Sequence, residues 1–176
     1  MAPDSVGNVV YRGIRRGFFR DVKEVLQSGS MFSLSALDEV GGFDESLVID
    51  GVDTEVCLQL RLRGWDVLTC PLRMEHQLGN AVVIRLAGRS VLLTRHQPFR
   101  DYYMTRNRIL LIRRHWRAEP FWCLGAARRL LTALVLTLAL DSQRKVKARA
   151  IALGFRDGVA NRSGALLKER RAQWSQ

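Results

Sequence analysis

Three carboxylates stand within six residues of one another, at Asp50, Asp53 and Glu55. Asp53 opens an apolar repeat of helical spacing that ends at Gly64, so the pattern predicts an amphipathic helix. The helix dipole stabilises an ionised carboxylate in the first turn by about 0.3–1 kcal/mol. The residues therefore allow two interpretations. Asp53 is either a cap of the helix, or a general base that points into a cleft.

Two further groups have side chains suited to binding. The neutral imidazole of His76 is a good Mn²⁺ ligand beside carboxylate and diphosphate oxygens, although a lone loop histidine also occurs without any ligand. Tyr102, Tyr103, Arg106 and Asn107 follow one another at helical spacing. This face either presents a guanidinium to a diphosphate, or packs its tyrosines against the core beside a solvated arginine. The spacing alone leaves both alternatives open.

Several elements must position these residues. After the helix that ends at Gly64, residues 65–70 predict a strand closed by Pro71, and residues 77–94 predict a loop or a hairpin. Ser35 is expected to cap a short helix over residues 36–40. Three helices are expected in the second half of the chain, over residues 98–115, 120–140 and 142–155. Within the second of them, the apolar run 130–140 is shorter than the roughly 20 residues of a membrane span.

The composition is that of a globular protein with one domain, or one domain and an appendage. The 176 residues are 47% hydrophobic and 26% charged. The three cysteines have no CxxC spacing, which argues against a disulfide framework or a zinc cluster and fits a reducing compartment. The first residues lack the basic and apolar regions of a secretory signal.

The positive charge is confined to the second half of the chain. Residues 1–100 hold 12 Lys and Arg against 12 Asp and Glu, whereas residues 101–176 hold 16 against 5, a net charge of +11. A basic helical tail requires an anionic partner, and its aromatic residues favour an anionic membrane surface. A nucleic-acid-binding module is the less favoured alternative, because no zinc finger, RNA-recognition sequence or convincing helix-turn-helix accompanies the charge.

Five motifs in order carry a resemblance to a known family. Over about residues 25–160 the chain resembles the acceptor-side half of family 2 glycosyltransferases with a GT-A fold. Within that family it is most similar to the rhamnosyltransferases that build bacterial polysaccharides. The motifs are Ser28-Gly29-Ser30-Met31-Phe32, Gly41-Gly42-Phe43-Asp44-Glu45, Asp50-Gly51-Val52-Asp53-Thr54-Glu55, Met74-Glu75-His76-Gln77-Leu78-Gly79 and Tyr102-Tyr103-Met104-Thr105-Arg106-Asn107.

The resemblance implies an α/β fold, the C-terminal half of a GT-A-like transferase followed by basic amphipathic helices. Residues 1–97 would be a partial catalytic domain, and residues 98–176 a membrane-associating tail. The implied activity is inverting transfer of a sugar, with rhamnose expected, from dTDP-rhamnose or a UDP-sugar to a polysaccharide or lipid-linked glycan. The implied location is cytoplasmic, peripheral on the inner face of the plasma membrane.

The resemblance also implies roles for single residues. Asp53 falls at the catalytic base, with Asp50 and Glu55 as competitors for that role, and His76 falls at a ligand of Mn²⁺ or Mg²⁺. The remaining matches are expected to bind substrate, and they are Asp50, Glu55, Tyr102, Tyr103, Arg106 and Asn107.

One part of the family pattern is absent from the sequence. The chain has no Asp-x-Asp, and about 27 residues precede the matching region, against about 100 for a nucleotide-binding half. The expectation is therefore a chain without that half and with an incomplete metal site. It would be a truncated product or one piece of a split enzyme. The alternative is a non-catalytic remnant, or a partner subunit that binds the membrane surface.

Overall fold

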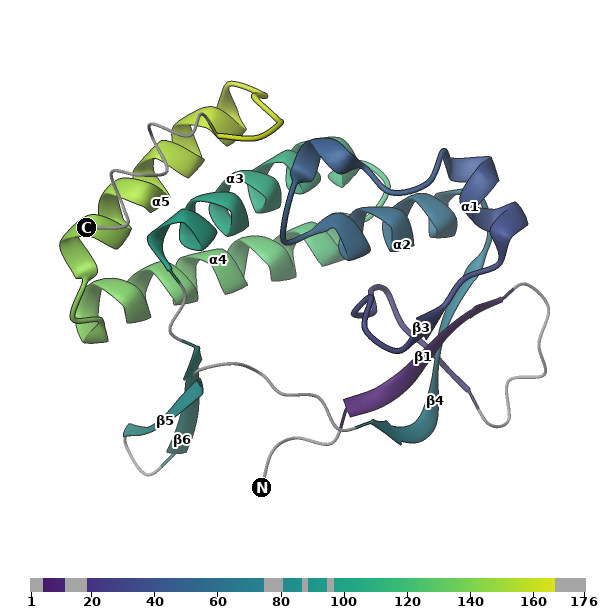
Figure 1. Ribbon diagram of the computed structural model, residues 1–176, viewed down its shortest axis with the longest axis horizontal. Coiled ribbons are helices and arrows are strands. Elements are labelled where there is room, and N and C mark those ends of the chain that lie inside the picture. The colour runs from purple at the N-terminus through teal and green to yellow at the C-terminus, as the bar shows by residue number, and fades with distance from the viewer. Residues whose placement is uncertain (1–4, 12–18, 75–80, 87–88, 95–96, 167–176) are drawn as a thin grey trace.

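The computed structural model describes residues 5–11, 19–74, 81–86, 89–94 and 97–166, with side chains over 19–70 and 97–166. A small sheet lies on one side of the molecule and three long helices lie together on the other (Figure 1). Two shorter helices connect these parts. Helices account for most of the regular structure in the described residues.

The sheet has the strand order β2-β4-β1-β3. Strand β4 pairs antiparallel with β1 and β2, while β1 pairs parallel with β3. The expectation that the strand ends at Pro71 was wrong, because β4 continues to Met74. The β1–β4 register is irregular between Val6 and Asn8, which places Pro71 in the irregular stretch, where a missing N–H costs little. The strands are β1 Ser5–Tyr11, β2 Arg20–Asp21, β3 Ser30–Met31 and β4 Asp66–Met74.

Two helices pack against the sheet and form the first core. They are α1 (Leu34–Val40) and α2 (Val52–Leu62), separated by the short 3₁₀ helix η1 (Glu45–Leu47). The predicted cap at Ser35 was wrong, since α1 begins two residues earlier than predicted and its N-cap is Ser33. The predicted stop of α2 is confirmed, because Gly64 has a left-handed φ of 80°. The buried residues of this core are Val25, Ala36, Val56, Cys57, Leu60 and Val67.

A hairpin and three helices complete the described chain. Strands β5 (Ala81–Leu86) and β6 (Arg89–Thr94) pair antiparallel, which confirms the hairpin among the two alternatives for residues 77–94. The first two predicted helices are confirmed as α3 (Pro98–His115) and α4 (Pro120–Leu140). The third, α5 (Arg144–Val159), runs past the predicted end at residue 155.

A second core joins the two halves of the chain. Leu47 and Leu58 pack with Leu110, Leu111 and Trp122 across the boundary expected at residue 97. Burial of these large apolar side chains stabilises the fold, because each Å² of apolar surface removed from water contributes about 25 cal/mol. The boundary itself stays a prediction, but apolar contacts hold the first half firmly to the helices.

Helices α3 and α5 approach closely because glycines stand between them. A Cβ at Gly154 would lie 2.5 Å from the carbonyl oxygen of Tyr102, and one at Gly158 would lie 2.9 Å from that of Arg106. The start of α5 is held by Lys147, whose ammonium lies 2.6 Å from the carboxylate of Asp141. Because both groups of this pair are buried, each compensates the desolvation of the other.

Helix α4 is long and apolar enough to cross a membrane by length and composition, with a mean hydropathy of 1.6. This corrects the expectation drawn from the run 130–140 alone, because the helix extends ten residues further back and tolerates Arg128 and Arg129. A single helix of this kind is weak evidence for a span. Its inner face packs against the other helices through Trp122, Cys123 and Ala126.

We expect Gly154→Ala to lower the free energy of unfolding by about 1–3 kcal/mol, because the methyl group meets a backbone carbonyl that cannot move alone. Gly125→Ala in α4 is the matched control. Its Cβ meets only the guanidinium of Arg129 at 3.6 Å, so we expect a gain of about 0.5–1 kcal/mol. Urea unfolding of both variants measures the difference, and equal stabilities would contradict the close α3–α5 packing.

Candidate functional site

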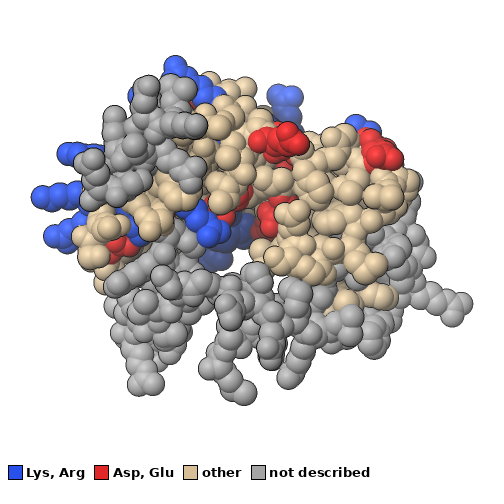
Figure 2. All heavy atoms as spheres, viewed as in Figure 1, with Lys and Arg blue, Asp and Glu red and all other residues tan. Residues whose placement is uncertain are grey.

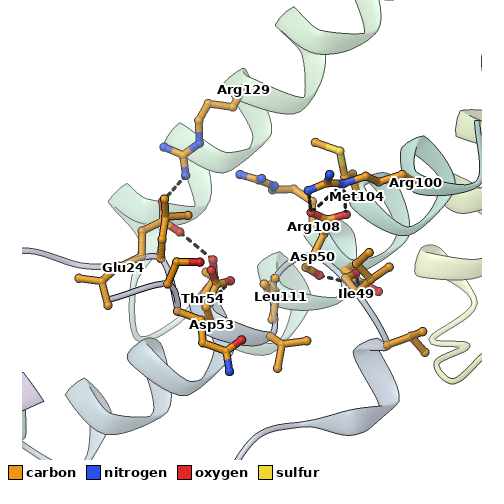
Figure 3. A pocket seen from close by; sticks show the side chains of 18 of the residues that line it. Glu24, Ile49, Asp50, Asp53, Thr54, Arg100, Met104, Arg108, Leu111 and Arg129 are labelled. Carbon is orange, nitrogen blue, oxygen red and sulfur yellow. Dashed lines mark hydrogen bonds and ion pairs between the residues drawn. The ribbon is translucent and has the colours of Figure 1, made fainter. Parts of the chain in front are cut away.

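A cavity of about 710 Å³ lies between the start of α2, the segment before β3, and helices α3 and α4. Three carboxylates and three arginines face it (Figure 3). A partly open cavity with opposed charges is suited to a polar substrate that carries both hydroxyl and anionic groups. The charged residues are Glu24, Asp50, Asp53, Arg100, Arg108 and Arg129.

Asp53 lies in the first turn of α2 and faces the cavity. It is not the cap of the helix, because that position belongs to Gly51. One carboxylate oxygen accepts a hydrogen bond from the backbone N–H of Thr54 at 2.9 Å. Burial raises the pKa of Asp53, and the negative charge of Glu24 raises it further, against backbone hydrogen bonds that lower it. A carboxylate with a raised pKa in a cavity is suited to accept a proton.

Asp50 lies at the rim of the same cavity and is paired with Arg100. The guanidinium binds both carboxylate oxygens, with nitrogen–oxygen distances of 2.9 and 2.8 Å. This contact raises the pKa of Arg100. Asp50 and the following Gly51 both have left-handed φ values, of 62° and 89°. A Cβ at Gly51 would lie 3.3 Å from Leu111, so the backbone approaches α3 closely here.

The loop before α2 is held by two buried polar side chains of α3. The amide nitrogen of Asn107 lies 2.7–2.8 Å from three loop carbonyls, those of Leu47, Ile49 and Asp50. Arg106 donates to the carbonyls of Ser46 and Leu47 at 3.2 Å. The carbonyls of Ser46 and Leu47 also accept from the backbone N–H groups of Gly164 and Ile49, and Asn107 supplies a donor to those of Ile49 and Asp50.

The two tyrosines of the same motif are buried against α5. The Tyr102 hydroxyl donates to Asp157 at 3.0 Å, and the Tyr103 hydroxyl accepts from the backbone N–H of Leu166 at 2.8 Å. The guanidinium of Arg106 lies over both rings, 5.5 and 4.7 Å from their centres. Of the two alternatives for this motif, the structure therefore has the tyrosines packed in the core, with the arginine buried among them.

We correct the expected roles of these residues on physical grounds. Tyr102, Tyr103 and Arg106 do not line the cavity, and their polar atoms are engaged by the protein. Asn107 reaches the cavity wall, but its amide group is occupied by the loop carbonyls. We assign all four a positioning role in place of the expected contact with substrate.

Glu55 points away from the cavity into the second core. Its carboxylate lies 2.6 Å from Nε2 of His115 and 3.3 Å from Arg114. Burial raises the pKa of Glu55, but the hydrogen bonds and charges of His115, Gln59 and Arg114 outweigh burial and hold it below its usual value. The expectation that Glu55 binds substrate is corrected for this reason.

The expected metal ligand His76 lies outside the described residues. Within the described part of the chain, no three His, Cys, Asp or Glu side chains are grouped to hold a metal ion. Glu24, Asp50 and Asp53 face the same cavity, but both carboxylate oxygens of Asp50 are bound by Arg100. The described residues therefore do not complete a site for Mn²⁺ or Mg²⁺.

Four charged residues of the cavity were missed by sequence reasoning, namely Glu24, Arg100, Arg108 and Arg129. A signal for two of them was present. Arg100, Met104, Arg108 and Leu111 follow the 3.6-residue period and form one face of α3. Glu24 and Arg129 offered no comparable signal, because only the fold brings them to the start of α2.

Comparison with curated proteins gives one partial likeness. Over 91 residues the chain is 38% identical to the dTDP-rhamnosyl transferase RfbF of Shigella flexneri, which is 51% of this chain and 30% of that protein. The chain thus matches less than a third of the length of its relative. No family model matches the chain, and no solved structure matches it. The likeness supports a glycosyltransferase of the rhamnosyltransferase kind over the matched part.

We expect Asn107→Ala to lower the free energy of unfolding by about 1–3 kcal/mol, because buried loop carbonyls lose their donor. Arg113→Ala, an exposed site on the same helix, is the control and is expected within about 0.5 kcal/mol of wild type. Chemical denaturation measures both. A change at Asn107 no larger than at Arg113 would contradict the anchoring role.

Proposed function

We propose that this chain takes part in inverting transfer of rhamnose from dTDP-rhamnose to a hydroxyl of a glycan acceptor. The observation that carries the proposal is Asp53, a carboxylate of raised pKa that faces a cavity of about 710 Å³. The partial likeness to a dTDP-rhamnosyl transferase supports the sugar and the donor. In this proposal the described residues belong to the acceptor-side part of a GT-A-like family 2 fold.

In the proposed step Asp53 removes the proton from the acceptor hydroxyl. The oxygen attacks the anomeric carbon of the donor, and the bond from that carbon to the diphosphate oxygen breaks on the opposite side. The electron pair leaves with the nucleoside diphosphate, the proton stays on Asp53, and the anomeric configuration inverts. The raised pKa makes Asp53 a better proton acceptor than an ordinary aspartate.

The surrounding residues orient this base rather than react. The N–H of Thr54 holds one carboxylate oxygen of Asp53 at 2.9 Å, and the Thr54 hydroxyl donates to Glu24 at 3.1 Å. Asn107 holds the loop that ends at Asp50, so α2 begins at a defined place beside α3. Such positioning accelerates a displacement because the reacting atoms are aligned before the reaction.

We expect Asp53→Asn to reduce rhamnosyl transfer by about 10²–10⁴-fold, since the amide cannot accept the proton. The acid limb of the wild-type pH–activity profile should lie above pH 3.8, the ordinary value for an aspartate, because the pKa is raised. The assay follows labelled rhamnose from dTDP-rhamnose into glycan, with the protein purified from its own cells in the assembly it forms there.

Asp38→Asn is the matched control, because Asp38 is an exposed aspartate of α1 outside the cavity. Full activity of Asp53→Asn would exclude Asp53 as the base and favour a non-catalytic role. Transfer from a UDP-sugar but not from dTDP-rhamnose would exclude the proposed donor.

We also propose that the protein lies at the cytoplasmic face of the membrane through α4. One side of α4, away from the buried Trp122, exposes apolar side chains at steps of three, four and seven residues. They are Phe121, Leu124, Leu131, Val135 and Leu138. Basic side chains gather at the edge of the molecule where the helices lie (Figure 2). Because the inner face of α4 packs on protein, a position on the membrane surface is favoured over a span.

We expect the double variant Leu131→Asp, Val135→Asp to lower binding to vesicles of phosphatidylglycerol at least tenfold, because it places charge on the apolar face. The control pair Leu34→Asp, Leu62→Asp adds the same charges at exposed leucines of α1 and α2. Sedimentation with vesicles measures both. Equal loss in the two pairs, or no binding by the wild type, would refute α4 as the contact.

A further inference from the structure

Arg108 differs in its contacts from the other two arginines of the cavity, and it stands where this cavity meets a second one. Arg100 is bound to Asp50, and Arg129 is bound to Glu24 at 3.1 Å. Within the described chain no hydrogen bond or ion pair is found for the Arg108 guanidinium, although the side chain is partly buried. Burial and the nearby charge of Arg129 lower the pKa of Arg108. A partly buried cation without such a bond is suited to bind an anion.

Arg108 and Arg129 face each other from α3 and α4, on the side of the cavity away from Asp53 (Figure 3). Two guanidinium groups that converge in this way match the oxygens of a phosphate or diphosphate. The ion pair of Arg129 with Glu24 is partly exposed, so a phosphate displaces Glu24 at little cost.

A second cavity, of about 240 Å³, begins at these arginines. Met104, Arg108 and Arg129 line both cavities. Beyond them the walls are mainly apolar and come from α3, α4 and α5. Asp101, Thr105 and Thr137 are the polar exceptions, and the carboxylate of Asp101 lies 3.7 Å from the ammonium of Lys147. The apolar lining residues are Met104, Leu130, Ala133, Leu134 and Ile151.

We propose that the two cavities together hold one amphiphilic acceptor, with a phosphate or diphosphate between Arg108 and Arg129, a hydrocarbon chain in the groove beside Leu134, and its sugar at Asp53. The sugar, the phosphate and the hydrocarbon chain of the acceptor would then meet, in that order, the carboxylate of Asp53, the two arginines and the apolar walls of the second cavity. This inference rests on the proposed function, because it assigns the acceptor to the cavity of Asp53. It identifies the acceptor as a lipid phosphate rather than a free polysaccharide.

Calorimetric titration of the full chain tests the assignment with three probes, namely farnesyl diphosphate, inorganic pyrophosphate and farnesol. We expect farnesyl diphosphate to bind at least tenfold more tightly than either of the others, because it alone occupies both subsites. Arg108→Gln should weaken farnesyl diphosphate and pyrophosphate at least tenfold each, and Arg108→Lys should restore part of the loss. Leu134→Gln should weaken only farnesyl diphosphate.

Arg113→Gln, at an exposed arginine of α3, is the matched control and should leave all three affinities unchanged. Unfolding curves of each variant identify any loss that reflects misfolding, and the lysine variant keeps the test valid if Arg108→Gln is unstable. Equal binding of farnesyl diphosphate and pyrophosphate would overturn the proposal, as would an Arg108→Gln variant with wild-type affinity.

Two further outcomes separate this inference from alternatives. If Arg108→Gln weakens binding to phosphatidylglycerol vesicles as much as it weakens farnesyl diphosphate, the groove holds a bilayer lipid and the acceptor assignment is overturned. Rhamnosyl transfer without Arg108-dependent binding overturns this inference alone. Binding as expected without any transfer overturns the proposed function instead.

Discussion

The arrangement of the site depends on the hydrogen bonds that Arg106 and Asn107 make to the loop before α2. This loop contains two residues with left-handed φ values, Val48 and Asp50, and its carbonyls point toward α3 instead of into a regular ladder. Buried carbonyls without donors would cost about 1–3 kcal/mol each. Two neighbouring side chains of α3 remove that cost, and the same contacts determine where α2 begins.

The position of Asp53 follows from this constraint. Because α2 starts directly after the anchored loop, its first turn faces the cavity while its next turn enters the core. Asp53 and Glu55 stand two residues apart, which on a helix places them about 200° apart. One carboxylate therefore remains in the cavity with a raised pKa, and the other is buried with His115 and has a lowered pKa. The pKa values of two acidic residues in one short segment are thus shifted in opposite directions.

Helix α4 both lines the two cavities and carries the proposed membrane surface. The inner face of α4 closes both cavities and carries Arg129, while its outer face exposes a row of apolar side chains. The glycines of α5 allow it to approach α3, which brings Ile151 into the wall of the groove. The site and the proposed membrane surface are thereby two sides of the same helix, so a lipid-linked acceptor would reach Asp53 over a short path.

The sequence alone determined those features that depend on local periodicity and on single residue types. Helices α2, α3 and α4, the stop at Gly64 and the motif around Asp53 were all predictable, because helical spacing and glycine conformation act within a few residues. For residues 77–94 the sequence left a loop and a hairpin as alternatives. The continuation of β4 through Pro71 was not, since it depends on an irregular pairing with a distant strand. Tertiary structure alone decided which polar residues are buried. Tyr102, Arg106 and Asn107 have the composition of a binding motif, yet their polar groups are engaged within the protein. Tyr102 donates to the side chain of Asp157, and Arg106 and Asn107 donate to carbonyls of the loop before α2. It also brought Glu24, Arg108 and Arg129 to Asp53, because contact between side chains from distant elements is specified by packing and not by spacing along the chain.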